Sequence, residues 1–205
     1  MERRLAAILA ADAVGYSRLM GSNEVATLAE MQKIFGEIFG EAIDEAGGRI
    51  VKLLGDGILA EFASVVGALE SALVIQEAMA KRNVGVPEDR QIHFRIGINM
   101  GDVLFEGGDV FGDGVNIAAR IEALARPGCI AVSGAVRDQV GNKIGIAFDA
   151  AGEQRLKNIE GVVPIFHVRP QSGEVQPSAA NASSHASIAV LPFENMSDDP
   201  EQEYF

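Results

Sequence analysis

The sequence holds only one cysteine, Cys129, among its 205 residues. A single thiol excludes an internal disulfide and a zinc site built from cysteines, and it fits a reducing compartment. No apolar stretch reaches the roughly 18 to 20 residues that a membrane-spanning helix needs. The start, Met1 to Arg4, leads into a strand-like run rather than a signal sequence. These absences predict a cytoplasmic protein without a membrane segment.

Basic residues are also scarce, with 17 lysines and arginines against 29 acidic residues and a formal net charge of -12. Nucleic acids and anionic membranes attract proteins through a positive field, so this balance argues against both as partners. Any phosphate group that the protein binds must therefore be held by a few individually placed cations.

The first half of the chain predicts a strand, a helix and a hairpin. Leu5 to Ala11 is a wholly apolar run that stops at Asp12, as in a buried strand that ends in a tight loop. Apolar residues then recur at helical spacing between Ser22, a candidate cap, and Gly47-Gly48. Two strand-like runs follow, and Gly55-Asp56-Gly57 between them has the composition of a hairpin turn.

The second half predicts further helices and strands. Residues 91–100 alternate between apolar and polar, so Arg95 projects from the face opposite the core side chains. The remaining strands are predicted at 49–54, 58–62, 102–105, 129–132, 144–148 and 163–168, and the remaining helices at 64–81, from near Gly114 and at 135–140. This order predicts a ferredoxin-like βαββαβ sandwich, an α+β fold with C-terminal additions. Its helices are expected on one face of the sheet and its functional site on the other.

Two aspartates stand out by their position in this fold. Asp12 ends the first strand and Asp56 lies at the hairpin tip, so the two can lie side by side at one end of the sheet. There they could share a pair of divalent cations, and without a nearby histidine or cysteine they favour Mg²⁺ or Mn²⁺. Taken singly, each aspartate is more often a turn or cap residue. Such cations normally accompany a nucleoside triphosphate.

A few polar and basic side chains are candidates for binding that nucleotide. Asn116 and Arg120 lie four residues apart on one helix face, where an amide and a guanidinium suit a sugar oxygen and a phosphate. A solvated polar stripe is the alternative. Lys52 lies in an otherwise apolar strand and therefore needs a partner, such as a ligand base. Arg95 and Lys157 add two cations, for which surface solubility is the alternative.

Several separated motifs resemble those of the class III nucleotidyl cyclase catalytic domain, the adenylyl and guanylyl cyclase family. They are ADAVGYS at 11–17, VKLLGDG at 51–57, FRIGINMG at 94–101 and DVFGDGVNIAAR at 109–120. The resemblance runs from Arg4 to Val168, and the elements between the motifs follow in the order that the family has. It implies the class III cyclase form of the predicted fold.

The resemblance also implies a role for each candidate residue. Asp12 and Asp56 would hold two metal ions, Mg²⁺ or Mn²⁺, and Arg95 would contact the terminal phosphates of ATP. A partner subunit would supply the other half of each site. The residues implied for that half are Lys52 and Asp109 for the adenine edge, Asn116 for the ribose, Arg120 for the α-phosphate and Lys157 for the triphosphate tail. Since one sequence holds both halves, a head-to-tail homodimer would form two equivalent interface sites.

The implied reaction is that of an adenylate cyclase, in which the ribose 3′-hydroxyl attacks its own α-phosphorus to give 3′,5′-cyclic AMP and pyrophosphate. Lys52 and Asp109 favour adenine, because an ammonium donates to N1 and a carboxylate accepts from the N6 amino group. A guanylate cyclase is the nearest alternative. The second alternative, from a different class, is a catalytically silent nucleotide-binding or dimerisation module that regulates a neighbouring domain.

The run GGDVF at 107–111 is one residue away from the GGDEF string of diguanylate cyclases. In those enzymes the string occupies the hairpin tip of the βαββ core, a place that Asp56 and its glycines take here. Gly107 and Gly108 are therefore interpreted as a turn, shorter than the arm that many class III cyclases have there. This shortening would reduce the dimer contacts that the arm makes. Asp109 after the turn is interpreted as a base-reading residue.

The chain is predicted to contain more than the catalytic domain, which is assigned to residues 1–170. Residues 171–186 are rich in Ser, Ala, Pro and Asn without periodicity, which predicts a flexible linker. Residues 187–205 begin a new apolar strand and resemble the start of a TolB-like domain. A C-terminal regulatory domain is therefore expected beyond Phe205 in a longer natural protein.

Overall fold

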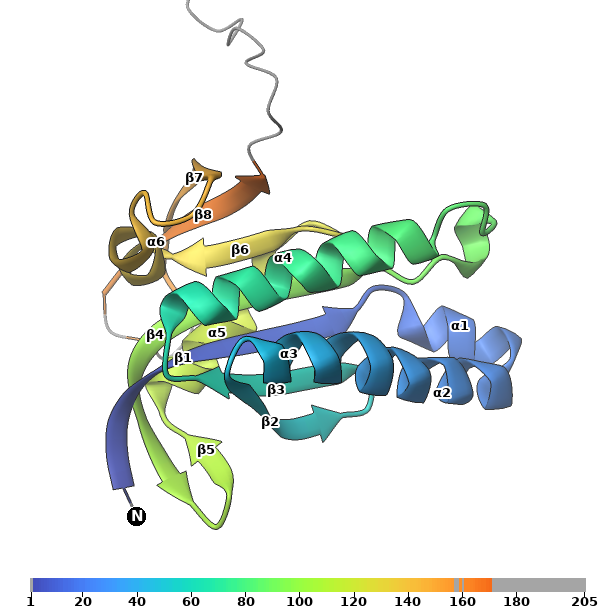
Figure 1. Ribbon diagram of the computed structural model, residues 1–205, viewed down its shortest axis with the longest axis horizontal. Coiled ribbons are helices and arrows are strands. Elements are labelled where there is room, and N and C mark those ends of the chain that lie inside the picture. Colours follow the sequence, from blue (N-terminus) through green and yellow to red (C-terminus); the bar gives the residue numbers. More distant parts are fainter. Residues whose placement is uncertain (1, 157–158, 160, 171–205) are drawn as a thin grey trace, which may run out of the picture. The chain divides into compact units, whose positions relative to one another are not determined.

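The computed structural model describes residues 2–156, 159 and 161–170 (Figure 1). Its helices are α1 (Tyr16–Ser22), α2 (Glu24–Lys33), the π-helix η1 (Ile34–Gly40), α3 (Glu41–Glu45), α4 (Val65–Arg82), the 3-10 helix η2 (Glu88–Arg90), α5 (Asp113–Leu124) and α6 (Gly134–Val140). None of these helices is both long and apolar enough to cross a membrane. Lys157 and the predicted linker and C-terminal segment, 171–205, lie outside the described residues.

The described strands form one sheet. They are β1 (Glu2–Ala13), β2 (Gly48–Leu54), β3 (Gly57–Phe62), β4 (Phe94–Glu106), β5 (Asp109–Phe111), β6 (Ile130–Ser133), β7 (Ile146–Gln154) and β8 (Val163–Pro170). Their order is β2-β3-β1-β4-β6-β8-β7, with β5 paired to β4. β1 is antiparallel to β3 and β4, whereas β4 and β6 are parallel and α5 forms the crossover between them. The order of β2, β3, β1 and β4 confirms the predicted ferredoxin-like α+β fold, to which β6, β8 and β7 are C-terminal additions.

β1 is buried on both faces of the sheet, which explains its uninterrupted apolar sequence. Ala7 and Leu9 belong to the larger core, which α4 covers. Ile8 and Ala10 point the other way and belong to a second core. Because side chains alternate along a strand, Asp12 has the same orientation as Ile8 and Ala10. The carboxylate of Asp12, near the C-terminal end of β1, therefore lies on the face of the second core.

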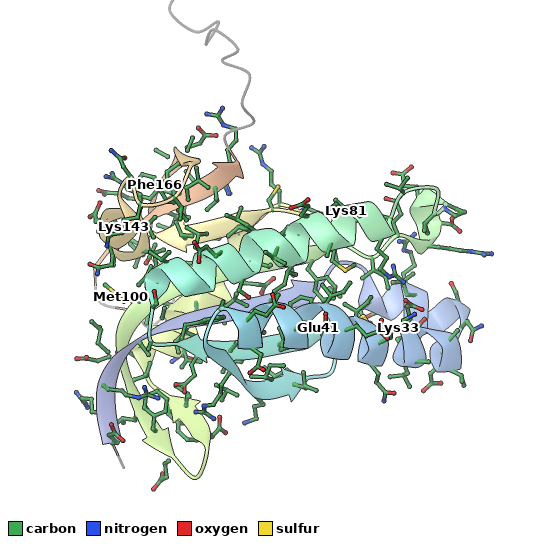
Figure 2. The ribbon with its side chains drawn as sticks, viewed as in Figure 1. Lys33, Glu41, Lys81, Met100, Lys143 and Phe166 are labelled. Carbon is green, nitrogen blue, oxygen red and sulfur yellow. The ribbon has the colours of Figure 1, made fainter. Side chains whose placement is uncertain are left out.

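The helices α2, η1, α3 and α4 cover the first face of the sheet, and Figure 1 shows them in front of the strands. Their inward side chains, such as Phe39 and Ile75, are fully buried, which stabilises the fold by roughly 1.5–3 kcal/mol for each large apolar side chain. Lys33, Glu41 and Lys81 lie on the outer side of this layer, as Figure 2 shows. The layer is therefore amphipathic, with its charged side in solvent.

The prediction that the helices lie on one face of the sheet is wrong for α5, which packs on the opposite face and lies behind the strands in Figure 1. A Cβ atom at Gly97 of β4 would lie 2.2 Å from the backbone nitrogen of Glu122 and 2.5 Å from the carbonyl oxygen of Ala118. Only a residue without a side chain permits this approach. The side-chain amide of Asn99, two residues along, donates to the carbonyl of Gly114 at 3.1 Å. The face that carries Arg95 is therefore covered in part by α5.

The long helical segment begins differently from the prediction. Asn23, not Ser22, caps α2, because its extended backbone lets its side chain accept a hydrogen bond from the N–H of Ala26 at 3.1 Å. Ser22 instead ends the additional helix α1 and donates to the carbonyl of Arg18. The predicted stop at the glycines is confirmed, since α3 ends at Glu45 just before them.

The strands β4, β5 and β7 differ most from the prediction. β4 is continuous, where separate strands were predicted at 91–100 and 102–105, because Gly101 keeps its register with Ala6 of β1. β5 had not been predicted, since three residues carry too little periodicity to be recognised as a strand. β7 begins and ends later than the predicted 144–148.

Gly97→Ala tests the close contact between α5 and β4. We expect the added methyl group to lower the free energy of unfolding by about 2 kcal/mol, since the obstructing atoms are backbone and cannot turn aside. The measurement is urea-induced unfolding followed by circular dichroism. Gly21→Ala is the control, because an added Cβ in α1 meets no atom within 4 Å. Equal stabilities of the two variants would contradict the packing described.

Candidate active site

Asp12 and Asp56 meet at one end of the sheet through the pairing of β1 with β3. Asp12 is the register partner of Gly57, and the N–H of Ala13 donates to the backbone carbonyl of Asp56 at 3.1 Å. An added Cβ at Gly57 would lie 3.5 Å from Oδ1 of Asp12, so the glycine leaves room beside the carboxylate. The side chain of Asp12 is 33% exposed, so this end of the sheet is accessible from solvent.

Burial and the charge of Asp56 disfavour ionisation of Asp12. Burial raises the pKa of Asp12 above its ordinary value of 3.8, the negative charge of Asp56 raises it further, and Arg95 opposes the rise. No cluster of three or more His, Cys, Asp or Glu side chains that could hold a metal occurs among the described residues. Two carboxylates are a donor set that a hard cation such as Mg²⁺ can use, with water and phosphate oxygens completing its shell.

Arg95 is held between two carboxylates from different elements. It is the register partner of Asp12, and its Nη2 donates to Oδ2 of Asp12 at 3.0 Å. Its Nε lies 2.9 Å from Oε1 of Glu122 on α5. Within the described part of the chain, neither Nε of Arg95 nor Oε1 of Glu122 makes a hydrogen bond. The contact between them is therefore an ion pair in which the N–H does not point at the oxygen.

Glu122 had no predicted role, yet it belongs to this group of charged side chains. It lies on the buried side of α5, and burial raises its pKa to about 7. Arg95 opposes this rise, whereas the charges of Asp12 and Asp56 add to it. The signal in the sequence was an acid at a position that helical periodicity assigns to the apolar side, next to Ile121.

Lys52 finds a partner within its own chain. Its Nζ lies 2.7 Å from Oδ2 of Asp109, which is on β5. The hydrogen bond from Lys52 holds the pKa of Asp109 below its ordinary value of 3.8, so the carboxylate is ionised at neutral pH. Lys52 is the register partner of Leu59, which belongs to the second core. The pair therefore lies on the same face of the sheet as Asp12 and Arg95.

The turn before Asp109 fixes its position opposite Lys52. Gly107 and Gly108 have φ angles of 60° and 87°, as in the tight two-residue turn that joins antiparallel strands. Arg49 on β2 donates to the carbonyl of Gly108 at 3.0 Å and so ties the turn to the neighbouring edge of the sheet. The interpretation of these two glycines as a turn is confirmed.

Asn116 and Arg120 lie on the outer side of α5. The residues on its sheet side are buried, whereas Asn116 is exposed and Arg120 is partly exposed. The two are one helical turn apart and thus neighbours. Nη1 of Arg120 is nevertheless buried, and it makes no hydrogen bond to any described residue. Within a single chain, both side chains point away from the sheet face that carries Asp12.

The structure thus separates the predicted site residues into three groups. Asp12, Asp56 and Arg95 form the first group, at the end of β1, and Glu122 joins it from α5. Lys52 and Asp109 form the second, and Asn116 with Arg120 the third, on the side of α5 opposite Glu122. The chemistry of the first group suits cations and phosphates, and that of the second suits the edge of a base.

Residues 3–169 match the family described as the adenylate and guanylate cyclase catalytic domain. The match includes every group of side chains described above and most of the chain. The chain therefore belongs to this family, which agrees with the resemblance found in its motifs.

Two curated relatives and one solved structure are similar over long stretches. The whole chain is 47% identical over 211 residues to "Putative adenylate cyclase 3" of Rhizobium meliloti (strain 1021). An adenylate cyclase of Streptomyces coelicolor is 35% identical over 140 residues, or 68% of this chain. The crystal structure of an adenylate/guanylate cyclase/hydrolase from Silicibacter pomeroyi is 45% identical, with a TM-score of 0.77 over 84% of this chain and 100% of that one. The chain spans only 36% and 35% of the two curated relatives.

The raised pKa of Glu122 gives the stability of the protein a pH dependence. The folded state favours the neutral acid, so this stabilisation is fully present below the ordinary pKa of 4.5 and is lost as the pH rises through about 7. Glu122→Gln is neutral at every pH. We expect the stability of the unchanged protein relative to this variant to fall between these two pH values, in urea unfolding with a metal chelator present. A difference that does not vary with pH would contradict the assignment.

Proposed function

We propose that the protein is an adenylate cyclase, which converts ATP into 3′,5′-cyclic AMP and pyrophosphate. The observation that carries the proposal is the Lys52–Asp109 ion pair in a chain of the cyclase family, a pair that would read the base in the half of each site supplied by the other copy. Lys52 would donate to N1 of adenine, and Asp109 would accept from its N6 amino group. Guanine instead presents N–H donors at N1 and N2, which a carboxylate would read. The names of the two curated relatives support the same substrate.

The first group of side chains would bind the triphosphate. Asp12 and Asp56 would hold two divalent cations, Mg²⁺ or Mn²⁺, together with phosphate oxygens. These cations, when bound, would favour the alkoxide of the ribose and neutralise charge on the phosphates. Arg95, beside Asp12, would contact the terminal phosphates through its Nη groups. Lys157 would hold the tail of the triphosphate.

The third group would act on the reacting atoms. The 3′ oxygen forms a bond to the α-phosphorus, the bond from that phosphorus to the bridging oxygen breaks, and pyrophosphate leaves with this oxygen. The hydroxyl proton passes to solvent. Asn116 would orient the ribose, and Arg120 would meet the negative charge that grows on the α-phosphate in the transition state.

One such site would require two copies of the chain. Asn116 and Arg120 point away from the sheet face of their own Asp12, and the body of α5 lies between them and Arg95. In a head-to-tail homodimer, the outer side of α5 in one copy would face the end of β1 in the other. The dimer would then contain two equivalent sites at its interface.

Two other functions are outcomes of the tests rather than separate proposals. A guanylate cyclase would require a base reader of the opposite polarity to the Lys52–Asp109 pair. A silent nucleotide-binding or dimerisation module would not need side chains that act at the α-phosphate. The sequence nevertheless retains both Asn116 and Arg120.

The direct test is a product assay with ATP and GTP side by side in the presence of Mn²⁺. We expect cyclic AMP from ATP and at least about tenfold less cyclic GMP from GTP, since a mispaired base edge costs about 1.4 kcal/mol or more. Asp56→Ala is the control and should form neither product. Dimeric protein that forms no cyclic AMP would contradict the proposal. An excess of cyclic GMP would indicate a guanylate cyclase, and nucleotide binding without product would indicate the silent module.

Mixing Asp56→Ala with Arg120→Ala tests whether two chains share a site. Each variant alone should be inactive, because both of its sites lack one group. Random pairing of equal amounts makes half of the dimers mixed, and each mixed dimer regains one of its two sites, so we expect about a quarter of the unchanged activity. Asp56→Ala mixed with Asp12→Ala is the control and should recover none. No recovery in the first mixture, with subunit exchange verified, would rule out a shared site.

A further inference from the structure

Glu122 is a buried carboxylate to which the proposed reaction assigns no role. The residue is only 9% exposed, and Oε1 lies 2.9 Å from Nε of Arg95. A buried carboxylate is costly unless it is paired, so this position needs the charge of Arg95. The contact is made possible by Gly97, which lets the backbone of Glu122 approach β4 closely.

Glu61 provides a comparison, because it is also a buried glutamate that pairs with arginine. Nη2 of Arg4 donates to its two oxygens at 3.1 and 3.2 Å, and Nε of Arg49 donates to it at 2.7 Å. These hydrogen bonds join β1, β2 and β3 and satisfy the carboxylate. Oε1 of Glu122, by contrast, makes no hydrogen bond to any described residue, and Glu122 shares its arginine with Asp12.

The hold of Asp12 on Arg95 would weaken when the site is loaded. A cation bound to Asp12 would draw negative charge from the carboxylate, and this would weaken its hydrogen bond to Nη2 of Arg95. Glu122 would then be the carboxylate that stays with Arg95. A guanidinium held at its Nε edge still presents both Nη groups, the fork that pairs with phosphate oxygens.

We propose that Glu122 is the positioning residue of Arg95, holding its Nε edge while the two Nη groups contact the terminal phosphates of the nucleotide. This role rests on the proposed function. Glu122 itself would not touch the nucleotide or the cations. By holding Arg95 in place, Glu122 would reduce the entropy that the arginine side chain loses when the triphosphate binds. Loss of Glu122 would therefore weaken binding of the triphosphate.

The role predicts a loss of phosphate affinity with little loss of turnover. An arginine that contacts the terminal phosphates equally in the substrate and in the transition state affects KM more than kcat. At about pH 8, where Glu122 is charged, we expect Glu122→Gln to raise the KM for ATP and the inhibition constant of inorganic tripolyphosphate about tenfold, and kcat to fall less than about threefold. Glu61→Gln, the matched control, should change the inhibition constant less than about twofold.

Two further measurements separate positioning from a general loss of structure. In an Arg95→Gln background, Glu122→Gln should change the inhibition constant less than about twofold, because the group that it positions is already absent. In an NMR spectrum of the unchanged protein, the Nε–H signal of Arg95, assigned by its loss in Arg95→Gln, should be present without metal and should persist when Mg²⁺ and tripolyphosphate are added. This signal remains informative even if Glu122→Gln does not fold.

Each outcome supports or overturns the role. An unchanged inhibition constant in Glu122→Gln, or an effect that persists without Arg95, would overturn it. Disappearance of the Nε–H signal on addition of Mg²⁺ and tripolyphosphate would do the same, because it would show that the Nε edge of Arg95 leaves its buried position beside Glu122. Failure of the unchanged protein to form cyclic AMP would instead contradict the proposed function, and it is observed in a separate assay.

Discussion

The close approach of α5 to β4 is the constraint on which the rest of the site depends. It is set at Gly97, where any side chain would collide with the backbone of α5. At this separation Glu122 of α5 forms an ion pair with Arg95 of β4, and Arg95 forms another with Asp12 of β1. These two ion pairs connect α5 to the end of β1 where Asp12 and Asp56 meet. The opposite side of the same helix carries Asn116 and Arg120. One packing contact therefore fixes the orientation of both sets of side chains.

The charges on the site face show how a protein with a net charge of -12 can be suited to a polyanion. On this face, Lys52 is held by Asp109 and Arg95 by Asp12. Such pairs keep the cations in place before any ligand arrives. In the proposed function, these pairs would be exchanged for contacts with a base edge or a phosphate, and the acids would bind metal ions or an amino group.

Much of the site could be predicted from the sequence, because strand endings and turns are local signals. The positions of Asp12 and Asp56 followed from an apolar run that stops and from a glycine-flanked turn, and alternation placed Arg95 on the face away from the larger core. Only the family resemblance placed Lys52 and Asp109 together, since 57 residues separate them and the sheet brings them into contact. Glu122 was missed because periodicity cannot show that a charged residue on the inner side of a helix has a partner. The wholly apolar first strand did contain the clue that both faces of the sheet are covered.

The central claim is that one catalytic site is built from two copies of the chain. The most direct test is a crystal structure of the protein with Mn²⁺ and an ATP analogue that cannot cyclise, in which anomalous scattering locates the metal. We expect Mn²⁺ between Asp12 and Asp56 of one copy, and Arg120 of the other copy beside the α-phosphate of the same nucleotide. A nucleotide whose α-phosphate contacts Arg120 of the same copy that holds the metal, or Mn²⁺ bound away from both aspartates, would contradict the claim.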